Sequence, residues 1–500
     1  MTITRDPSTG WITTKKLGAL TESFSYNQFG EQVGITVTGP SGSVAAIVEQ
    51  RDHLGRIVSR TTTTGSTHHT VTYTYDAADR VAAETDDGAK TTYGYDTAGN
   101  IVTVTTPSGT TKNTYDARNA LLRSGSTDYT YDGSGQLATA KGPSGATTYH
   151  YDALGNLTGV DVAGKPSVSY TIDPLNRRVA SAGGGATTSA IAYLDSQRPV
   201  ATFGPNGAVD EVYVYDGDLQ PVNINDGGGL LPAYLTKGGT AYLEVPDPSG
   251  GPALVIDAGT GAIADAVDRS ALGAVRSETH PAFQVIGYGG GIVDPATTLV
   301  RFGARDYDTA TGRWTAPDPL GIAGGSANLY TFVSGDPVNR TDPRGTCDYT
   351  AIGISGGVGL GPVAGGGGVG IAWGGGQFGT YSTVSGGGGL VGDLGVGVTV
   401  TCLNSDNGDT SLGNFSGTGS FGEGTVGPVS GGTDTGYDSA GNQSSHGGHG
   451  TVSFGGGLGG SVQGSLTSIV CLFGCPPPPT TVCGNLGCDS SPGKSPSDPG

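Results

Sequence analysis

The first 220 residues repeat one short pattern, in which an aromatic residue and Asp precede a small or polar turn and then an apolar residue. The clearest copies begin at Tyr75-Asp76, Tyr95-Asp96, Tyr115-Asp116, Tyr131-Asp132 and Tyr151-Asp152. Successive tyrosines are separated by 20, 20, 16 and 20 residues. A unit of this length is a short β-hairpin, which cannot bury an apolar face alone, so we expect the units to stack into one long sheet.

The residues between the turns favour strands. Stretches such as Thr70–Tyr75 and Thr147–Tyr151 are rich in Thr, Val and Tyr, which suit a pleated surface. Asp bonds its own backbone in a turn, and Gly or Asn three residues later supplies a positive φ. Helical periodicity is almost absent. The sequence therefore predicts an all-β fold, with one antiparallel sheet system over residues 1–346 and the repeat tyrosines packed between hairpins.

The pattern Tyr-Asp-x-x-Gly-Asn/Arg-Leu at this period resembles the YD repeats of the Rhs and Tc-toxin C-component family. The resemblance implies a strip of β-hairpins that spirals into a hollow shell around a C-terminal payload. We expect the repeats to occupy residues 1–240. This array is shorter than in typical relatives, so we expect that the shell does not close by itself.

A second block, residues 241–346, resembles the Rhs-associated core domain. Its ordered motifs are Asp247-Pro-Ser-Gly-Gly-Pro252, Asp257-Ala-Gly-Thr-Gly261, Arg305-Asp-Tyr-Asp308, Thr311-Gly-Arg313-Trp314, Pro317-Asp318-Pro-Leu-Gly321, Asn328-Leu-Tyr330, Asp336-Pro-Val-Asn339 and Asp342-Pro-Arg-Gly345. In the family this core ends at Asp-Pro-x-Gly-Leu, after which the chain can cut itself. The resemblance therefore implies a self-cleavage site at the end of the block.

The resemblance also implies two carboxylates that act as in aspartic proteases, where a pair shares one proton. By position, Asp318 is the first candidate and Asp294 the second. Arg313 would orient a carboxylate or neutralise an oxyanion. The expected cut lies around Gly345 and Thr346, where Thr346 replaces the usual Leu and removes an apolar anchor.

A structural interpretation of the same residues stays open. Asp294, Asp318, Asp336 and Asp342 all precede Pro, and Asp-Pro is an ordinary opening of a turn. Asp308 and Arg313 would then form a structural ion pair. Apart from this autoproteolysis, no residue pattern identifies an enzyme, and none identifies a cofactor or metal site in residues 1–346.

Residues 347–475 form a Gly-rich region, and 476–500 a Pro- and Ser-containing tail for which we expect disorder. Alternation of Gly or Ser with apolar residues favours strands with one bare face. A small sandwich or barrel is the first interpretation, and a membrane-inserting hairpin the second. All six Cys lie after Gly345. Their spacing favours disulfides, with a zinc site as the alternative.

Charge and hydropathy argue against several classes of function. The net charge of −19 argues against nucleic-acid binding and against electrostatic binding to anionic lipid. No run of about 18 apolar residues predicts a transmembrane helix, and the N-terminus shows no Sec signal, so export would use another route or the chain is part of a longer one. We expect an Rhs-type protein, secreted or delivered to the cell surface, with a delivery machinery and an immunity protein as partners. The alternative is a non-enzymatic adhesin that binds glycans or neighbouring cells.

Overall fold

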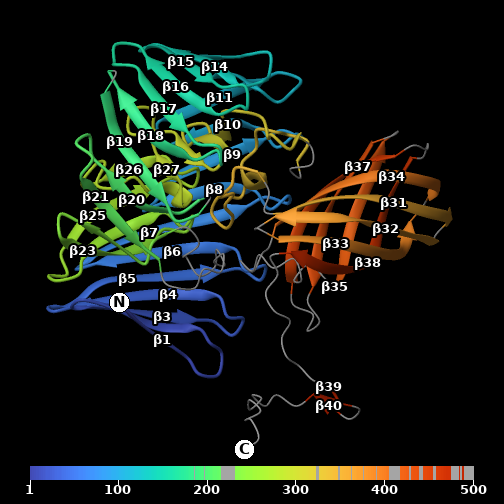
Figure 1. Cartoon of the computed structure of the whole chain (residues 1–500), viewed down its shortest axis with the longest axis horizontal. Coiled ribbons are helices and arrows are strands. Elements are labelled where there is room, and N and C mark those ends of the chain that lie inside the picture. The colour runs from blue at the N-terminus through green and yellow to red at the C-terminus, as the bar shows by residue number, and fades with distance from the viewer. Residues whose placement is uncertain are drawn as a thin grey trace, which may run out of the picture.

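Strands dominate the chain, as the repeats predict (Figure 1). The computed structural model describes residues 1–184, 186–195, 197–215, 231–321 and 326–346, together with the backbone of strands between Tyr349 and Cys488. Within these residues there is no α-helix, and the short 3-10 turns include η2 (Tyr288–Gly290) and η4 (Val333–Gly335). No helix in this part of the chain is long and apolar enough to cross a membrane. The predicted all-β class is confirmed.

Twenty-six strands form the main sheet, and each pairs antiparallel with the next strand along the chain. The first thirteen are β1 (Thr2–Arg5), β2 (Ile12–Leu17), β3 (Leu20–Tyr26), β4 (Gln32–Gly39), β5 (Gly42–Arg51), β6 (Ile57–Thr64), β7 (Thr67–Tyr75), β8 (Val81–Asp86), β9 (Ala89–Tyr95), β10 (Ile101–Thr106), β11 (Gly109–Tyr115), β12 (Leu121–Ser124) and β13 (Thr127–Tyr131). The others are β14 (Leu137–Gly142), β15 (Gly145–Tyr151), β16 (Leu157–Val162), β17 (Val168–Ile172), β18 (Arg178–Gly183), β19 (Ala186–Tyr193), β20 (Pro199–Phe203), β21 (Val209–Val214), β22 (Tyr234–Lys237), β23 (Thr240–Pro246), β24 (Pro252–Asp257), β25 (Ile263–Arg269) and β26 (Val275–Glu278). The sheet therefore continues past residue 240, as far as Glu278.

The turn that recurs in the repeats owes its shape to its Asp. Asp76 Oδ1 accepts the backbone N–H groups of Ala78 and Arg80, at 2.9 and 3.0 Å. The backbone of Asp76 also donates to the carbonyl of Arg80, at 2.9 Å. Asp79 takes a φ of 60°, the left-handed conformation that Gly or Asn takes at this position in other copies. The predicted turn chemistry is therefore present.

Several repeat tyrosines join their hairpin to the one before it. The Tyr75 hydroxyl donates to the carbonyl of Ile57, at 2.5 Å, and the Arg56 guanidinium lies 4.4 Å from the centre of the Tyr75 ring. In the next repeat, Tyr95 donates to Val81 and lies over the guanidinium of Arg80. These contacts confirm the predicted packing of tyrosines between hairpins.

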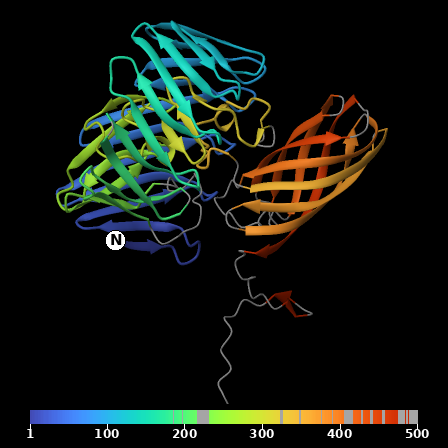
Figure 2. The same ribbon diagram turned by 45° about the horizontal axis from the view of Figure 1, so that its top comes forward.

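The segment that follows the main sheet folds back between its strands. We call residues 286–346 the plug. It contains a four-stranded sheet of β27 (Ile292–Val293), β28 (Val300–Phe302), β29 (Arg305–Asp308) and β30 (Arg313–Trp314). Tyr288, Phe302, Tyr307, Trp314 and Phe332 form its apolar centre. In Figure 2 the plug (yellow) lies between the blue and the green strands of the curved main sheet. Its apolar centre fixes the loops that carry the candidate site.

For the C-terminal region, the structure describes only the backbone of the strands. Eight strands close into a ring in the order β31–β32–β33–β38–β35–β36–β37–β34. Their bounds are β31 (Tyr349–Gly361), β32 (Val363–Gly374), β33 (Gln377–Gly389), β34 (Val391–Asn404), β35 (Gly417–Val426), β36 (Val429–Tyr437), β37 (Gln443–Ser453) and β38 (Leu458–Phe473), followed by a pair, β39 (Cys483–Gly484) and β40 (Gly487–Cys488). The predicted disulfides, the alternative zinc site and the disordered tail lie outside the described residues.

Candidate self-cleavage site

Arg305, on β29, is the centre of the candidate site. Its Nη2 lies 2.8 Å from Asp318 Oδ2 and 3.0 Å from Asp342 Oδ2. Its Nε donates to the carbonyl oxygen of Gly345, at 2.6 Å. The side chain is 4% exposed and stacks on the Trp314 ring, 4.1 Å from the ring centre. One buried guanidinium thus holds two carboxylates and the last Gly of the plug.

Both polar groups of the Gly345–Thr346 peptide bond have a partner in this site. Arg305 donates to its carbonyl oxygen, and its N–H donates to Asp342 Oδ1, at 3.1 Å. Gly345 adopts a φ of 62°, and a Cβ added there would lie 2.4 Å from the carbonyl oxygen of Phe302. Only Gly fits this close approach without moving the backbone. The sequence-predicted cleavage residues therefore lie directly against two charged groups.

Asp318 follows β30, in the loop that the plug turns toward Arg305. Its Oδ1 accepts the backbone N–H of Leu320, at 2.8 Å, and its own N–H donates to the carbonyl of Leu329, at 2.9 Å. Burial raises the pKa of the Asp318 carboxyl, while the neighbouring Arg305 lowers it. Loss of hydration also lowers the pKa of Arg305, against the opposite effect of Asp342 and Asp318. The site is therefore a buried cation between two acids.

Asp294 has a different environment. Its Oδ2 accepts the hydroxyl of Tyr170, and its Oδ1 accepts the backbone N–H groups of Ala296 and Thr297, at 2.7 and 3.2 Å. Within the described residues, none of its hydrogen bonds reaches Asp318. The geometry brings Asp342, and not Asp294, to the guanidinium that holds Asp318.

Arg313 also has another role in the fold. Its Nη1 donates to Asn100 Oδ1, at 2.9 Å, and its guanidinium lies 4.7 Å from the centre of the Tyr115 ring. Arg80 occupies the matching position one repeat earlier and stacks on Tyr95 in the same way. Arg313 therefore supplies from the plug the guanidinium that the repeat ending in Asn100 lacks. No ion pair joins Arg313 to Asp308 in the part of the chain that the structure describes.

Two residues of this site were missed by the sequence analysis as participants, Arg305 and Asp342. A signal for Asp342 exists, because Asp318-Pro-Leu-Gly321 and Asp342-Pro-Arg-Gly345 repeat the same spelling. Arg305 has no comparable signal, since it is one Arg in a strand. Its role follows only from the way the plug folds.

Comparison with known proteins places the chain among its relatives. The Teneurin YD-shell family model matches residues 1–338. Teneurin-4 of Homo sapiens is 34% identical over 187 residues, which are 36% of this chain and 6% of that protein. Teneurin-1 of Gallus gallus is 33% identical over 181 residues, 35% of this chain and 6% of that protein. The chain thus spans a small part of the length of these relatives.

Solved structures show the same architecture. The crystal structure of TcdB2-TccC3 matches with a TM-score of 0.53 and 20% identity, over 69% of this chain and 19% of that one. The crystal structure of TcdB2-TccC3-Cdc42 matches with a TM-score of 0.54 and 18% identity, over the same shares. These matches confirm the shell fold and the resemblance to YD-repeat proteins. With a family model that covers more than half of its length, the chain belongs to the Teneurin YD-shell family.

Proposed function

We propose that this YD-shell protein presents residues 346–500 and separates them from the shell by cutting its own Gly345–Thr346 bond. The observation that carries the proposal is the environment of this bond. Arg305 lies on its carbonyl oxygen and Asp342 on its nitrogen, while Asp318 contacts the same guanidinium. This arrangement provides a group for each atom whose charge changes during hydrolysis.

The proposed reaction needs only water. An ionised carboxylate of the Asp318–Asp342 pair takes a proton from water, and the oxygen attacks the carbonyl carbon of Gly345. Arg305 stabilises the negative charge that forms on the carbonyl oxygen. The neutral carboxyl gives its proton to the carbonyl oxygen and recovers it when the C–N bond breaks, while the base passes the proton that it took from water to the nitrogen of Thr346. The products are a Gly345 carboxylate and an amine at Thr346.

Burial supports this division of roles. A carboxyl whose pKa is raised can stay neutral and act as the acid, and burial moves Asp318 in that direction. Asp342 is placed to exchange a proton with the Thr346 nitrogen. Secretion or delivery to the cell surface, an immunity protein and a delivery machinery complete the proposal for the whole protein.

The test is a denaturing gel with intact-mass analysis of the purified full chain. The parent is expected to give two fragments, residues 1–345 and 346–500. Asp318→Asn and Asp342→Asn should each give a single band of 49.8 kDa, because an amide cannot exchange the required proton. Asp294→Asn changes the residue that the sequence analysis gave as the second carboxylate, and because the hydrogen bonds of Asp294 go to Tyr170, Ala296 and Thr297, this variant should still be cut.

Two outcomes would contradict the proposal. A parent that stays uncut while its circular dichroism spectrum shows folded β-structure would leave the plug with a structural role only. Cutting that persists in Asp342→Asn but stops in Asp294→Asn would return the second carboxylate to Asp294. Thr346→Leu tests the missing anchor and should increase the rate of cutting if that anchor limits it.

A further inference from the structure

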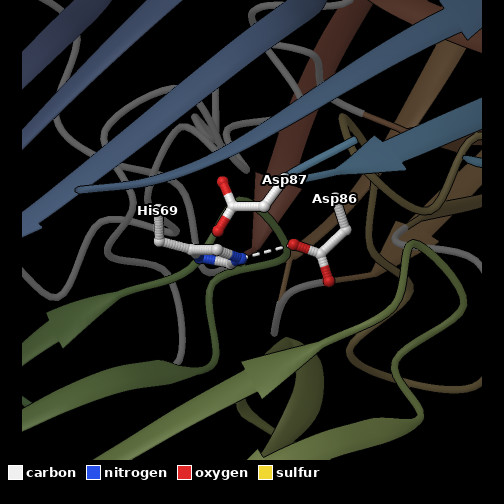
Figure 3. Close-up of side chains that lie close together, drawn as sticks. All are labelled: His69, Asp86 and Asp87. Atoms are coloured by element: carbon white, nitrogen blue, oxygen red, sulfur yellow. Dashed lines mark hydrogen bonds and ion pairs between the residues drawn. The ribbon is translucent and has the colours of Figure 1, made fainter. Parts of the chain in front are cut away.

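A His and two Asp side chains meet at the edge of the main sheet, away from the plug. His69 lies near the start of β7, and Asp86 and Asp87 end the neighbouring strand β8 and open the next turn. One ligand atom from each of the three lies within 4.8 Å of the others. Figure 3 shows the imidazole and both carboxylates turned toward one another. These nitrogen and oxygen donors are gathered closely enough for a small movement of the side chains to bring them onto one metal ion.

Groups outside the cluster contact one oxygen of each carboxylate. Asp86 Oδ2 lies 3.4 Å from Arg276 Nη1, while its Oδ1 lies 2.5 Å from His69 Nε2. Asp87 Oδ1 accepts the backbone N–H of Thr70, at 2.8 Å, which leaves its second oxygen for another ligand. Such outer contacts are the usual means by which proteins orient metal ligands.

The local charge favours a cation. Arg276 is shared by Asp86, Asp268 and Glu84, with its nitrogens 3.4, 3.3 and 2.6 Å from their oxygens. Asp87 adds a fourth carboxylate beside this group. Arg276 therefore contacts three of these four acids, and the four carboxylates together carry more negative charge than one guanidinium balances. A divalent ion between His69, Asp86 and Asp87 would offset it.

A second His–Asp pair shows what this cluster adds. His150 Nε2 lies 2.7 Å from Asp161 Oδ2 across β15 and β16, and both side chains are about half exposed. No third ligand group joins that pair among the described residues. At His69, by contrast, Asp87 completes a set of three donors. The two sites are therefore matched in their ion pair and differ in the third ligand.

One of the three residues, His69, also lines a cavity of about 380 Å³ between β6–β7 and β24–β25. We propose that His69, Asp86 and Asp87 bind one divalent transition-metal ion, with Zn²⁺ as the best match to one imidazole and two carboxylates. Water or a small anion would complete the coordination of the ion. The proposal is independent of self-cleavage in the plug.

The experiment is calorimetric titration of the full chain with Zn²⁺, after chelation and alkylation of the cysteines. Alkylation removes the thiols as competing ligands. The parent is expected to bind one equivalent more than His69→Ala. His68→Ala changes the adjacent residue, which contacts Thr63 instead, and His150→Ala changes the matched pair. Both controls should bind as much Zn²⁺ as the parent.

Asp87→Asn keeps the test independent of folding. Asn followed by Gly88 is a favoured hairpin turn, so the variant should retain the β8–β9 turn. It removes one anionic ligand and should weaken Zn²⁺ binding at least about tenfold. If His69→Ala and Asp87→Asn both bind Zn²⁺ with the stoichiometry and affinity of the parent, the proposal is wrong.

Discussion

At the scale of single residues, Glu244 is a buried acid without a cationic partner among its hydrogen bonds. It is buried on β23 and accepts the side-chain N–H of Gln284, at 2.6 Å. Within the described residues its Oε2 has no hydrogen-bond partner, and neither has Gln284 Oε1. Burial raises the pKa of Glu244 to about 8 from the usual 4.5, with a further contribution from the charge of Glu211. Glu244 is therefore neutral in the folded protein at pH 7.

This shift predicts how stability changes with pH. Between pH 4.5 and about 8 the folded chain binds a proton that the unfolded chain has lost, so the free energy of unfolding falls as the pH rises and levels off above pH 8. Glu244→Gln is neutral in both states and should avoid this loss. We expect it to exceed the parent by on the order of a few kcal/mol above pH 8 in urea unfolding.

The control for this prediction is Glu211→Gln. Glu211 accepts from Lys237 Nζ, at 2.9 Å, and from the Thr202 hydroxyl, at 3.1 Å. Its removal leaves the ammonium group without this carboxylate, so it should destabilise the protein at all pH values where Lys237 is charged. A parent whose unfolding free energy is constant from pH 5 to 8 would show that Glu244 is ionised.

Residue patterns also mark what can be predicted from sequence. The turn at Asp76 is local, because the donors and acceptors that fix it lie within four residues, and its chemistry was predictable. Arg305 contacts residues 13 and 37 positions away, and nothing near it in the sequence indicates them. The same holds for the Tyr170 hydroxyl, which binds Asp294 from a distant repeat. Local patterns thus predict turns, while the candidate site depends on the packing of the plug.

At the scale of elements, the plug strand β30 completes a repeat of the main sheet. Asn100 stands at the position where three other repeats have Arg56, Arg80 and Arg177. Arg313 reaches Asn100 from the plug while stacking on Tyr115. Arg313 Nη2 also donates to the carbonyl of Asn119. An Arg introduced at position 100 would occupy the same space as the Arg313 guanidinium. The contact therefore couples β30 to the β9–β10 turn.

This coupling can be measured with a double-mutant cycle. Asn100→Arg alone should lower the melting temperature, because two guanidinium groups would compete for Tyr115. Arg313→Ala alone should lower it by removing buried hydrogen bonds. In the double variant the new Arg can bind Asp96 and stack on Tyr115. The loss in free energy of unfolding of the double variant should therefore be at least about 0.5 kcal/mol smaller than the sum of the losses of the two single variants. Simple additivity would show that the two positions do not compete.

At the scale of the whole molecule, contacts between distant segments hold the curved sheet in its shape. Asn339 of the plug accepts the backbone N–H of Ile57 and donates to the Tyr75 hydroxyl, both at 2.8 Å. These partners lie 282 and 264 residues away in the sequence. The strand order followed from the repeats, since each strand pairs with its neighbour. The contacts between the plug and the sheet did not, because they join such distant pairs.

Asn339→Ala tests how much this contact between the plug and the sheet contributes to stability. The Ile57 N–H would lose its acceptor, and we expect a loss of stability of about 1–3 kcal/mol. Hydrogen exchange followed by mass spectrometry should show faster exchange in the peptide that contains Ile57, with little change around Val160, which lies in another part of the sheet. Uniformly faster exchange across the sheet would instead indicate global destabilisation.

Repeat tyrosines such as Tyr95 and Tyr193 contact the hairpin that precedes them in the chain, so the strip has a direction. The turn from Asp76 to Arg80 is sealed by Tyr95, which is made later in synthesis. A hairpin can thus form first and be stabilised by the hairpin that follows it. The strip can therefore assemble in the order in which the chain is synthesised. Deletion of repeats from the N-terminal side would leave the turns near Val81 and Arg178 in contact with their tyrosines, whereas deletion from the opposite side would remove Tyr95 or Tyr193 from a turn that remains.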